Sequence, residues 1–266
     1  MNKEVDSSHY ISKKERLKHV ITVYGRNTCL EVLCDDSLSI HRLHLACTNK
    51  YSKSLERLIE LANSRKINIR WHSRLQLARI SRNGKQDQGV ACDIQCPTYR
   101  HYTEIMNSMT LSQTTKLIAL DGITNPINLG MIIRSVTASS AFGILIPSKG
   151  NSVISPLAIK ASAGTAFKCN ILRCRELVTA LTDFQQRGFQ VSILDSNATD
   201  TIYDFVPSSP TIHILGNESV GISAPVRKIA NHMLRIPMHR GVESLNVAIV
   251  AAILLFQRRS KNHSLL

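Results

Sequence analysis

Residues 236–255, IPMHRGVESLNVAIVAAILL, decide how the C-terminal half of this chain is organised. The second half of the stretch, from Val247 to Leu255, is entirely apolar and predicts a buried helix. The first half brings Met, His, Arg, Gly, Glu, Ser and Asn directly before that helix. Ser244 and Asn246 are both suited to cap it, because each side chain has an oxygen that can accept a hydrogen bond from a free helical N–H. A polar loop leading into a core helix is typical of a plain helix start or of a binding site.

A second polar junction lies upstream, in residues 120–135, LDGITNPINLGMIIRS. Asn125 and Pro126 predict a turn, and Asn128 is suited to cap the helix that follows. Gly130 would let another group approach the first helical turn, and Arg134 lies about one turn further along. The alternative is an ordinary turn followed by a surface arginine.

The third junction is residues 213–223, HILGNESVGIS, where an apolar strand meets glycine and polar residues. Backbone amides near Gly216 could hold the polar edge of a ligand, and Glu218 offers a carboxylate. Since α/β proteins bind ligands where parallel strands end, we expect a site here. A strand–turn–helix with a solvent-facing glutamate is the alternative.

The chain predicts two α/β domains joined by a linker. Residues 1–19 are polar and loose, and residues 20–98 form a small α/β unit in which Leu43, Leu45 and Cys47 face inward from a half-buried strand. A helix follows, because Leu55, Leu58, Ile59 and Ala62 share one helical face. The polar stretch 99–114 is the expected linker.

Residues 115–266 predict a second α/β domain. Strands are expected at KLIALDG, GILIP, FQVSILD and TIHILG, with helices over 129–142 and 176–187 and Gly143 at a helix C-cap. Strands alternating with helices indicate a parallel sheet covered on both faces.

The charge balance favours a polyanionic partner. Lysine and arginine number 33 against 19 acidic residues, a formal net charge of +14. The excess is present both before and after residue 110, so it does not reside in a single tail. Nucleic acid, an anionic membrane face and a functionally silent basic surface all fit this balance.

The sequence argues against several classes of protein. The sequence has no apolar run long enough for a transmembrane helix, and its first 20 residues do not resemble a secretory signal. The seven cysteines form no CxxC pair, which indicates free thiols, no metal site and a cytoplasmic location. GxGxxG, P-loop, GxSxG and HExxH motifs are absent from the sequence, which argues against a nicotinamide-dependent oxidoreductase.

Taken together, the three junctions resemble the three motifs of the SpoU (TrmH-like) family of RNA ribose 2'-O-methyltransferases, part of the SPOUT superfamily. The matching segments are DGITNPINLGMIIRSVTASSAFG, LGNESVGIS and IPMHRGVESLNVAIVAAILLF. Residues 20–98 resemble the SpoU substrate-binding domain, a ribosomal-protein-like α/β fold. The resemblance implies a deep trefoil knot in the C-terminal domain, which hydrophobic patterns could not predict because knots are rare.

The resemblance also implies the residues of the site. Arg134 would be the catalytic residue, and Glu218 would orient it. Because a guanidinium is a poor base, an electrostatic role for Arg134 is chemically easier than proton abstraction. Asn128, Ser244 and Asn246 would position the reacting groups. The residues expected to bind S-adenosyl-L-methionine are Leu215, Gly216, Asn217, Ile236, Met238 and Leu245.

The expected partners follow from the same family. The resemblance implies a homodimer that acts on RNA without a metal or a membrane, and the extra N-terminal domain favours large-subunit ribosomal RNA. Two alternatives stay open: a tRNA 2'-O-methyltransferase, and an inactive RNA- or ribosome-binding protein on the same fold.

Overall fold

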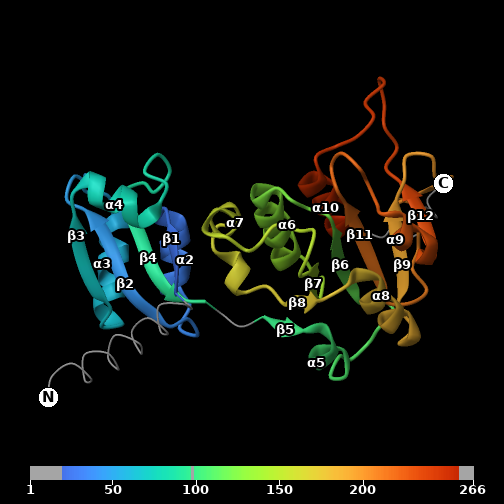
Figure 1. Cartoon of the computed structure of the whole chain (residues 1–266), viewed down its shortest axis with the longest axis horizontal. Helices are drawn as coiled ribbons and strands as arrows, with labels where there is room; N and C mark the ends of the chain where they lie inside the picture. The colour runs from blue at the N-terminus through green and yellow to red at the C-terminus, as the bar shows by residue number, and fades with distance from the viewer. Residues whose placement is uncertain (1–19, 97–98, 258–266) are drawn as a thin grey trace, which may run out of the picture. The chain divides into compact units, whose positions relative to one another are not determined.

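A computed structural model describes residues 20–96 and 99–257 of the chain (Figure 1). The chain divides into two compact units, Met1–Thr98 and Tyr99–Leu266. The expectation of a loose segment over residues 1–19 lies outside the described residues. Each unit has its own sheet.

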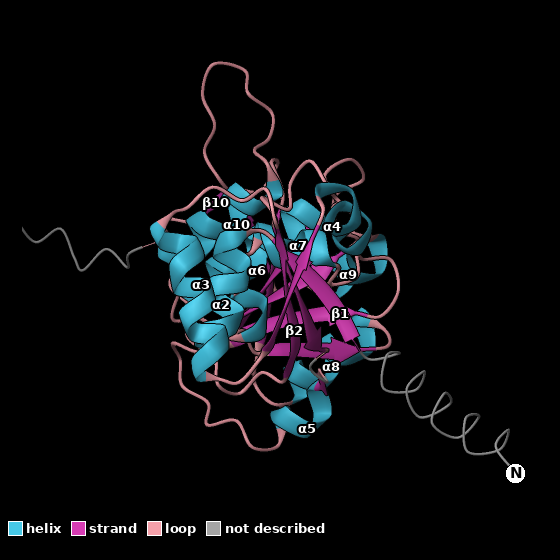
Figure 2. Cartoon of the chain, turned by 90° about the vertical axis from the view of Figure 1, so that its left-hand side faces the viewer, coloured by secondary structure: helices cyan, strands magenta, loops and turns pink. Residues whose placement is uncertain are grey.

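The first unit is a four-stranded mixed sheet with the strand order β1-β4-β2-β3. Its elements are β1 (Val20–Tyr24), α2 (Arg26–Cys34), β2 (Ile40–Ala46), α3 (Lys53–Ser64), β3 (Asn68–His72), α4 (Arg74–Ser81) and β4 (Val90–Gln95). Figure 2 shows α2 and α3 beside each other on one side of this sheet. On the opposite face Leu77 of α4 packs against Tyr24, Ala46 and Ala91.

Strand β2 is buried on both faces over its second half, which corrects the expected alternation. Leu43 and Leu45 are fully buried as predicted, but His44 and Ala46 are buried as well, and Cys47 is exposed. The reason is that helices cover both faces here. His44 is accommodated because both ring nitrogens make hydrogen bonds, to His72 and to Asp93.

The second unit contains an eight-stranded sheet in which every pair of neighbours is parallel, as the alternating pattern predicted. Its order is β10-β12-β9-β11-β6-β7-β8-β5. The strands are β5 (Arg100–His101), β6 (Lys116–Asp121), β7 (Gly143–Pro147), β8 (Ile171–Cys174), β9 (Gln190–Leu194), β10 (Asp200–Thr201), β11 (Thr211–Gly216) and β12 (His232–Arg235).

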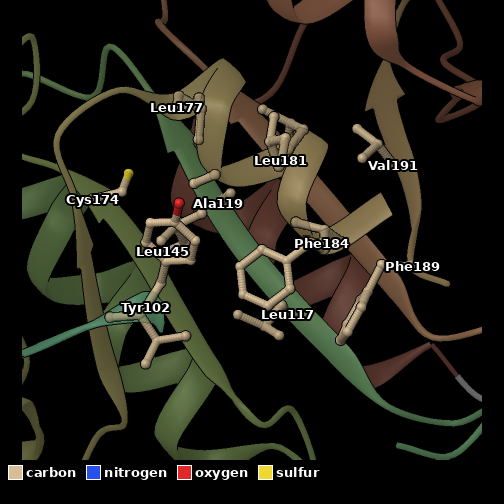
Figure 3. Packing of buried hydrophobic residues seen from close by; sticks show 14 of the residues in the cluster. Tyr102, Leu117, Ala119, Leu145, Cys174, Leu177, Leu181, Phe184, Phe189 and Val191 are labelled. Carbon is tan, nitrogen blue, oxygen red and sulfur yellow. The ribbon is translucent and has the colours of Figure 1, made fainter. Parts of the chain in front are cut away.

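Helices cover both faces of this sheet. They are α5 (Tyr102–Met106), α6 (Pro126–Ala138), α7 (Pro156–Ala161), α8 (Leu177–Gln186), α9 (Ala224–Ile229) and α10 (Val247–Phe256), with a short 3-10 turn η1 (Thr165–Phe167). On one face α8 packs over β6 and β7, where Phe184 and Leu181 meet Leu117 and Leu145 (Figure 3). On the other face α6 contacts α7, α10 and β7, and α10 also contacts β11. The apolar half of residues 236–255 is therefore the core helix that was predicted.

Residues 99–114, predicted as a linker that could hold one short helix, belong to the second unit and contain a short strand as well as that helix. Residues 100–101 pair with β8 as the edge strand β5, and α5 follows immediately. Tyr102 and Met109 belong to the core of the second unit and are 5% and 8% exposed. A few apolar side chains are enough to anchor a polar segment when each of them is buried in the core.

Gly143 is the first residue of β7 and does not cap a helix. A Cβ atom there would lie 2.2 Å from the carbonyl oxygen of Asn170, so glycine is required by a close backbone approach. Helix α6 ends earlier, with Ser139 at its C-cap.

Candidate active site

A pocket of about 930 Å³ opens at the carboxyl ends of β9, β11 and β12. All six residues predicted to bind a cofactor line it, together with three of the five predicted to act in catalysis. The six are Leu215, Gly216, Asn217, Ile236, Met238 and Leu245, and the three are Glu218, Ser244 and Asn246. Two of the three junctions, residues 213–223 and 236–246, therefore contribute to one cavity.

The three motifs are joined beside this pocket by a chain of side-chain hydrogen bonds. Asn128 donates from Nδ2 to the Glu218 carboxylate and accepts at Oδ1 from Asn246 Nδ2 at 3.1 Å. Asn246 Oδ1 in turn accepts from the backbone N–H of Ala248 at 2.9 Å, which caps α10. We call Glu218, Asn128 and Asn246 the polar chain. It links the start of α6, the loop after β11 and the start of α10.

Asn128 is not the cap of α6. Asn125 caps that helix by accepting from the N–H of Ile127 at 2.8 Å, and Pro126 occupies the first turn. Asn128 lies within the first turn and is only 7% exposed, so its amide is directed into the protein. A buried amide that makes a hydrogen bond with each end fixes its own orientation.

Gly216 ends β11 at the floor of the pocket, and its lack of a side chain is required. A Cβ atom would lie 2.6 Å from the carbonyl carbon of Gly221 and 2.8 Å from the nitrogen of Ile222. Asn217 holds the following turn, because its Nδ2 donates to Gly122 O at 2.7 Å and its Oδ1 accepts from the N–H groups of Ser219 and Val220. The side chain of Asn217 thus shapes the loop rather than pointing freely into the pocket.

The loop from residue 236 to residue 246 projects from the sheet (Figure 1). Arg240 and Gly241 have φ angles of 57° and 72°, so the loop turns in the left-handed region. Ile236, Met238 and Leu245 line the pocket from this loop. Ser244 lines it too but is exposed.

Arg134 lies on the exposed side of α6, outside the residues that line the pocket. Within residues 20–96 and 99–257, Arg134 makes no hydrogen bond with Glu218, which accepts from Asn128 instead, so the role of Glu218 in orienting Arg134 stays a prediction. Arg134 is seven residues after Ile127, which places both on the same exposed face of α6.

The close approach predicted at Gly130 is made by another helix. A Cβ atom would lie 2.2 Å from Ala158 O and 2.6 Å from Ala161 Cβ, both on α7. Gly130 therefore allows α6 to pack closely on α7. No helix was predicted from the sequence at the position of α7.

Charged residues that sequence reasoning missed also line the pocket: Asp195, Arg235 and Glu243. Asp195 follows β9, and Arg227 donates to its carboxylate. The bond from Arg227, followed by the N–H of Asn197, lowers the pKa of Asp195. The position of Asp195 directly after an apolar strand was a sign of a binding residue. The sequence did not show which strands are neighbours, so Asp195 could not be assigned to this pocket.

Two family models match the chain. Residues 115–256 match the SpoU rRNA Methylase family, and residues 22–100 match a domain described as RNA 2'-O ribose methyltransferase substrate binding. Over the described residues, 20–96 and 99–257, no helix is long and apolar enough to cross a membrane.

Similar proteins agree with these models. A protein of Mycobacterium avium, named an uncharacterized tRNA/rRNA methyltransferase, is 32% identical over 241 residues, which cover 91% of this chain and 77% of the relative. The corresponding Mycobacterium leprae protein is also 32% identical, with the same coverage.

Solved structures share the fold. The SpoU methyltransferase AviRb of Streptomyces viridochromogenes, in complex with AdoMet, superposes with a TM-score of 0.73 at 20% identity, covering 90% of this chain and 89% of its own. An AdoMet-bound rRNA methyltransferase of Sinorhizobium meliloti gives a TM-score of 0.71 at 22% identity, covering 92% and 89%. The chain is therefore an RNA methyltransferase of the SpoU rRNA methylase family.

Proposed function

We propose that this chain transfers a methyl group from S-adenosylmethionine to a ribose 2'-hydroxyl of RNA, with large-subunit ribosomal RNA as the substrate. The observation that carries the proposal is the polar chain, which ties all three motifs to one pocket. The family models and the methyltransferase relatives support the reaction class.

The pocket suits a cationic, partly apolar cofactor. Among the described residues that line it, the carboxylates of Asp195, Glu218 and Glu243 outnumber the single arginine, Arg235. A surplus of carboxylates attracts a sulfonium cation. Apolar side chains of the 236–246 loop, including Met238 and Leu245, provide walls for an aromatic ring.

The cofactor would supply an activated methyl group, and the residues of the chain would hold the acceptor. Glu218 lines the pocket and accepts a hydrogen bond from Asn128, so its carboxylate would lose little freedom on binding the acceptor. Arg134 would clamp the phosphate next to the target ribose and polarise the hydroxyl. Ser244, exposed at the rim, would contact the same ribose.

The exposed face of α6 supports a homodimer. Ile127 and Met131 on α6 are 45% and 42% exposed, and Ile249 and Phe256 on α10 are 48% and 53% exposed. The two helices are in contact, so these side chains form an apolar surface next to Arg134. We infer that a second copy covers this surface and that Arg134 of one copy serves the pocket of the other. The trefoil knot belongs to the same proposal; the return of α10 onto α6 and β11 is compatible with it.

The activity is tested with labelled S-adenosylmethionine and separated large-subunit rRNA, small-subunit rRNA and tRNA, followed by mapping of the methylated nucleotide. We expect label in large-subunit rRNA. Label in tRNA alone would select the tRNA alternative, and no label in any RNA, despite RNA binding, would select the inactive binding protein.

Replacing Arg134 with Ala should abolish methyl transfer while RNA affinity changes little, because one phosphate contact is a small part of a large basic footprint. Arg57→Ala, an exposed arginine of α3, is the matched control. Full activity of the Arg134 variant would refute the role given to it.

A mixing experiment tests whether Arg134 acts in the partner's site. The Arg134→Ala variant is combined with a Gly216→Ala variant, whose pocket is damaged. The two are either mixed and refolded together or co-expressed. If Arg134 serves the other copy, half the random dimers carry one intact site, and about a quarter of wild-type activity returns. If Arg134 serves its own pocket, both sites of each mixed dimer are defective and no activity returns.

A further inference from the structure

A second polar network crosses the sheet of the first unit and has no part in the pocket. It uses one residue from each of the four strands: Thr22 on β1, Asp93 on β4, His44 on β2 and His72 on β3. Thr22 Oγ1 donates to Asp93 Oδ1 at 2.7 Å, and His44 Nε2 lies 3.0 Å from Asp93 Oδ2. His44 Nδ1 lies 2.9 Å from His72 Nε2. The network therefore crosses the whole sheet, from the edge strand β1 through the partly buried Asp93 and the buried His44 to the other edge strand, β3.

Hydrogen bonding fixes the direction of this network. Burial would raise the pKa of Asp93, but hydrogen bonds from His44 and Thr22 outweigh it and the pKa is lowered, so the group is a carboxylate that only accepts. His44 must then donate from Nε2. When the Nε2 proton is the single ring proton of His44, His44 Nδ1 accepts, His72 donates from Nε2, and His72 Nδ1 is left as an acceptor.

His72 is held neutral by its surroundings. Burial, followed by the nearby His44, Arg42 and Arg70, lowers its pKa. In the described part of the chain His72 Nδ1 makes no hydrogen bond, and the side chain is partly exposed. An acceptor nitrogen is therefore available at the surface.

Two arginines lie on the same sheet face as His72, and Arg70 is directly opposite His44 in the register. Arg70 is two residues before His72 on β3, and Arg42 is two residues before His44 on β2, so all four side chains point the same way. Both arginines are exposed. Guanidinium groups bind phosphates, and a neutral acceptor suits a hydroxyl donor. RNA carries both groups in each nucleotide, and the 2'-hydroxyl distinguishes it from DNA.

We propose that His72, Arg42 and Arg70 form a ribose–phosphate subsite that accepts a hydrogen bond from an RNA 2'-hydroxyl at His72 Nδ1. This sheet-face subsite rests on the proposed function in that it takes RNA as the substrate. It adds the place on the first unit where RNA is told from DNA. The Asp93–His44 pair keeps the imidazole of His72 in the accepting form.

The test measures binding of the full chain to a mixed-sequence 20-nucleotide RNA and to its 2'-fluoro counterpart, by fluorescence anisotropy. The 2'-fluorine keeps the sugar in an RNA-like conformation but cannot donate a hydrogen bond. We expect His72→Phe to weaken binding of the RNA about five- to tenfold, the value of one hydrogen bond, with 2'-fluoro RNA unaffected. The preference for RNA over its fluoro analogue shrinks by the same factor.

Asp93→Asn gives a sharper outcome. Its amide oxygen can still accept from Thr22 while its NH2 donates to His44 Nε2, which reverses the two hydrogen bonds made by His44 and turns His72 Nδ1 into a donor. This variant should lose the preference for the 2'-hydroxyl while keeping its circular dichroism spectrum. A network that only braces the sheet would instead lower stability and leave the RNA to 2'-fluoro ratio unchanged in both variants, which overturns the inference.

The arginines are tested as a pair. Arg42→Gln with Arg70→Gln should weaken both ligands equally and reduce the salt dependence of binding by about 1.4 in log–log slope. Lys53→Gln with Arg57→Gln removes the same charge from exposed positions on α3, across the sheet, and is the matched control. Equal effects of the two double variants would also overturn the subsite. Since none of these measurements needs turnover, a chain that binds RNA through His72 but transfers no methyl group fails only the proposed function.

Discussion

Asn128 is the middle member of the polar chain, and replacing it with Asp tests whether that chain holds the site together. The substitution keeps the size and shape of the side chain. The new carboxylate can still accept from Asn246, but it can no longer donate to Glu218. The perturbation therefore removes one hydrogen bond and places two carboxylates in contact.

The expected cost follows from those two changes. A hydrogen bond to a charged group contributes about 1.5–3 kcal/mol, and solvent at the exposed Glu218 reduces this value, so we expect a loss of about 2 kcal/mol at pH 7.5. For a domain of this size, that loss lowers Tm by roughly 4–8 °C. At pH 5 one of the two carboxyl groups can hold a proton and donate again, so the deficit should fall below about 1 kcal/mol.

Thermal unfolding followed by two signals separates the units. The single tryptophan of the chain, Trp71, lies on β3 and reports the first unit, whereas circular dichroism reports both. Asn128→Asp should shift the dichroism transition and leave the fluorescence transition in place. Asn125→Asp is the control, because Asp caps a helix as well as Asn does. A variant as stable as wild type at pH 7.5, or one with an equal deficit at pH 5, would refute the reasoning.

Two further predictions concern the second unit. Gly216→Ala should weaken S-adenosylmethionine binding at least tenfold by calorimetry, because the added methyl group meets the backbone of Gly221 at 2.6 Å and must displace the pocket turn; an unchanged affinity contradicts this. His213 lies on β11, buried beside Ser192 of β9, and burial, followed by Lys116, lowers its pKa to about 4. The unfolded chain takes up that proton near pH 6.5, so a contribution of about 3 kcal/mol is present above pH 6.5 and is lost as pH falls toward 4. Urea unfolding at pH 7.5 and 4.5 should show a smaller acid loss for His213→Asn than for wild type, and an equal loss would count against the assignment.

The sequence predicted the parts of the fold that have long apolar runs. Residues 116–121, 143–147, 190–194 and 211–216 are strands because each run is buried on both faces of a parallel sheet. Strands β8 and β12 escaped notice because each has four residues and a charged one among them, Arg173 or Arg235. Strand β5 escaped because its hydrogen-bonding partner lies about 70 residues further along the chain.

The site was partly predictable for a similar reason. The rule that ligands bind where parallel strands end located Glu218, and the polar start of α10 located Asn246. The hydrogen bond between Asn128 and Glu218 was not predictable, because it depends on β6 and β11 being neighbours in the sheet. Arg134 was assigned from family resemblance, and helical geometry alone would have left it a surface residue.

The polar chain also sets the order in which a newly made molecule becomes competent. Asn128 and Asn246 are separated by 118 positions, so translation at about 5–20 residues per second leaves roughly 6 to 24 s between their synthesis. The last strand of the first unit's sheet ends at Gln95, which is synthesised before that interval begins. A nascent chain therefore acquires its first folded unit well before it can assemble the pocket, and methylation competence is the last property to emerge.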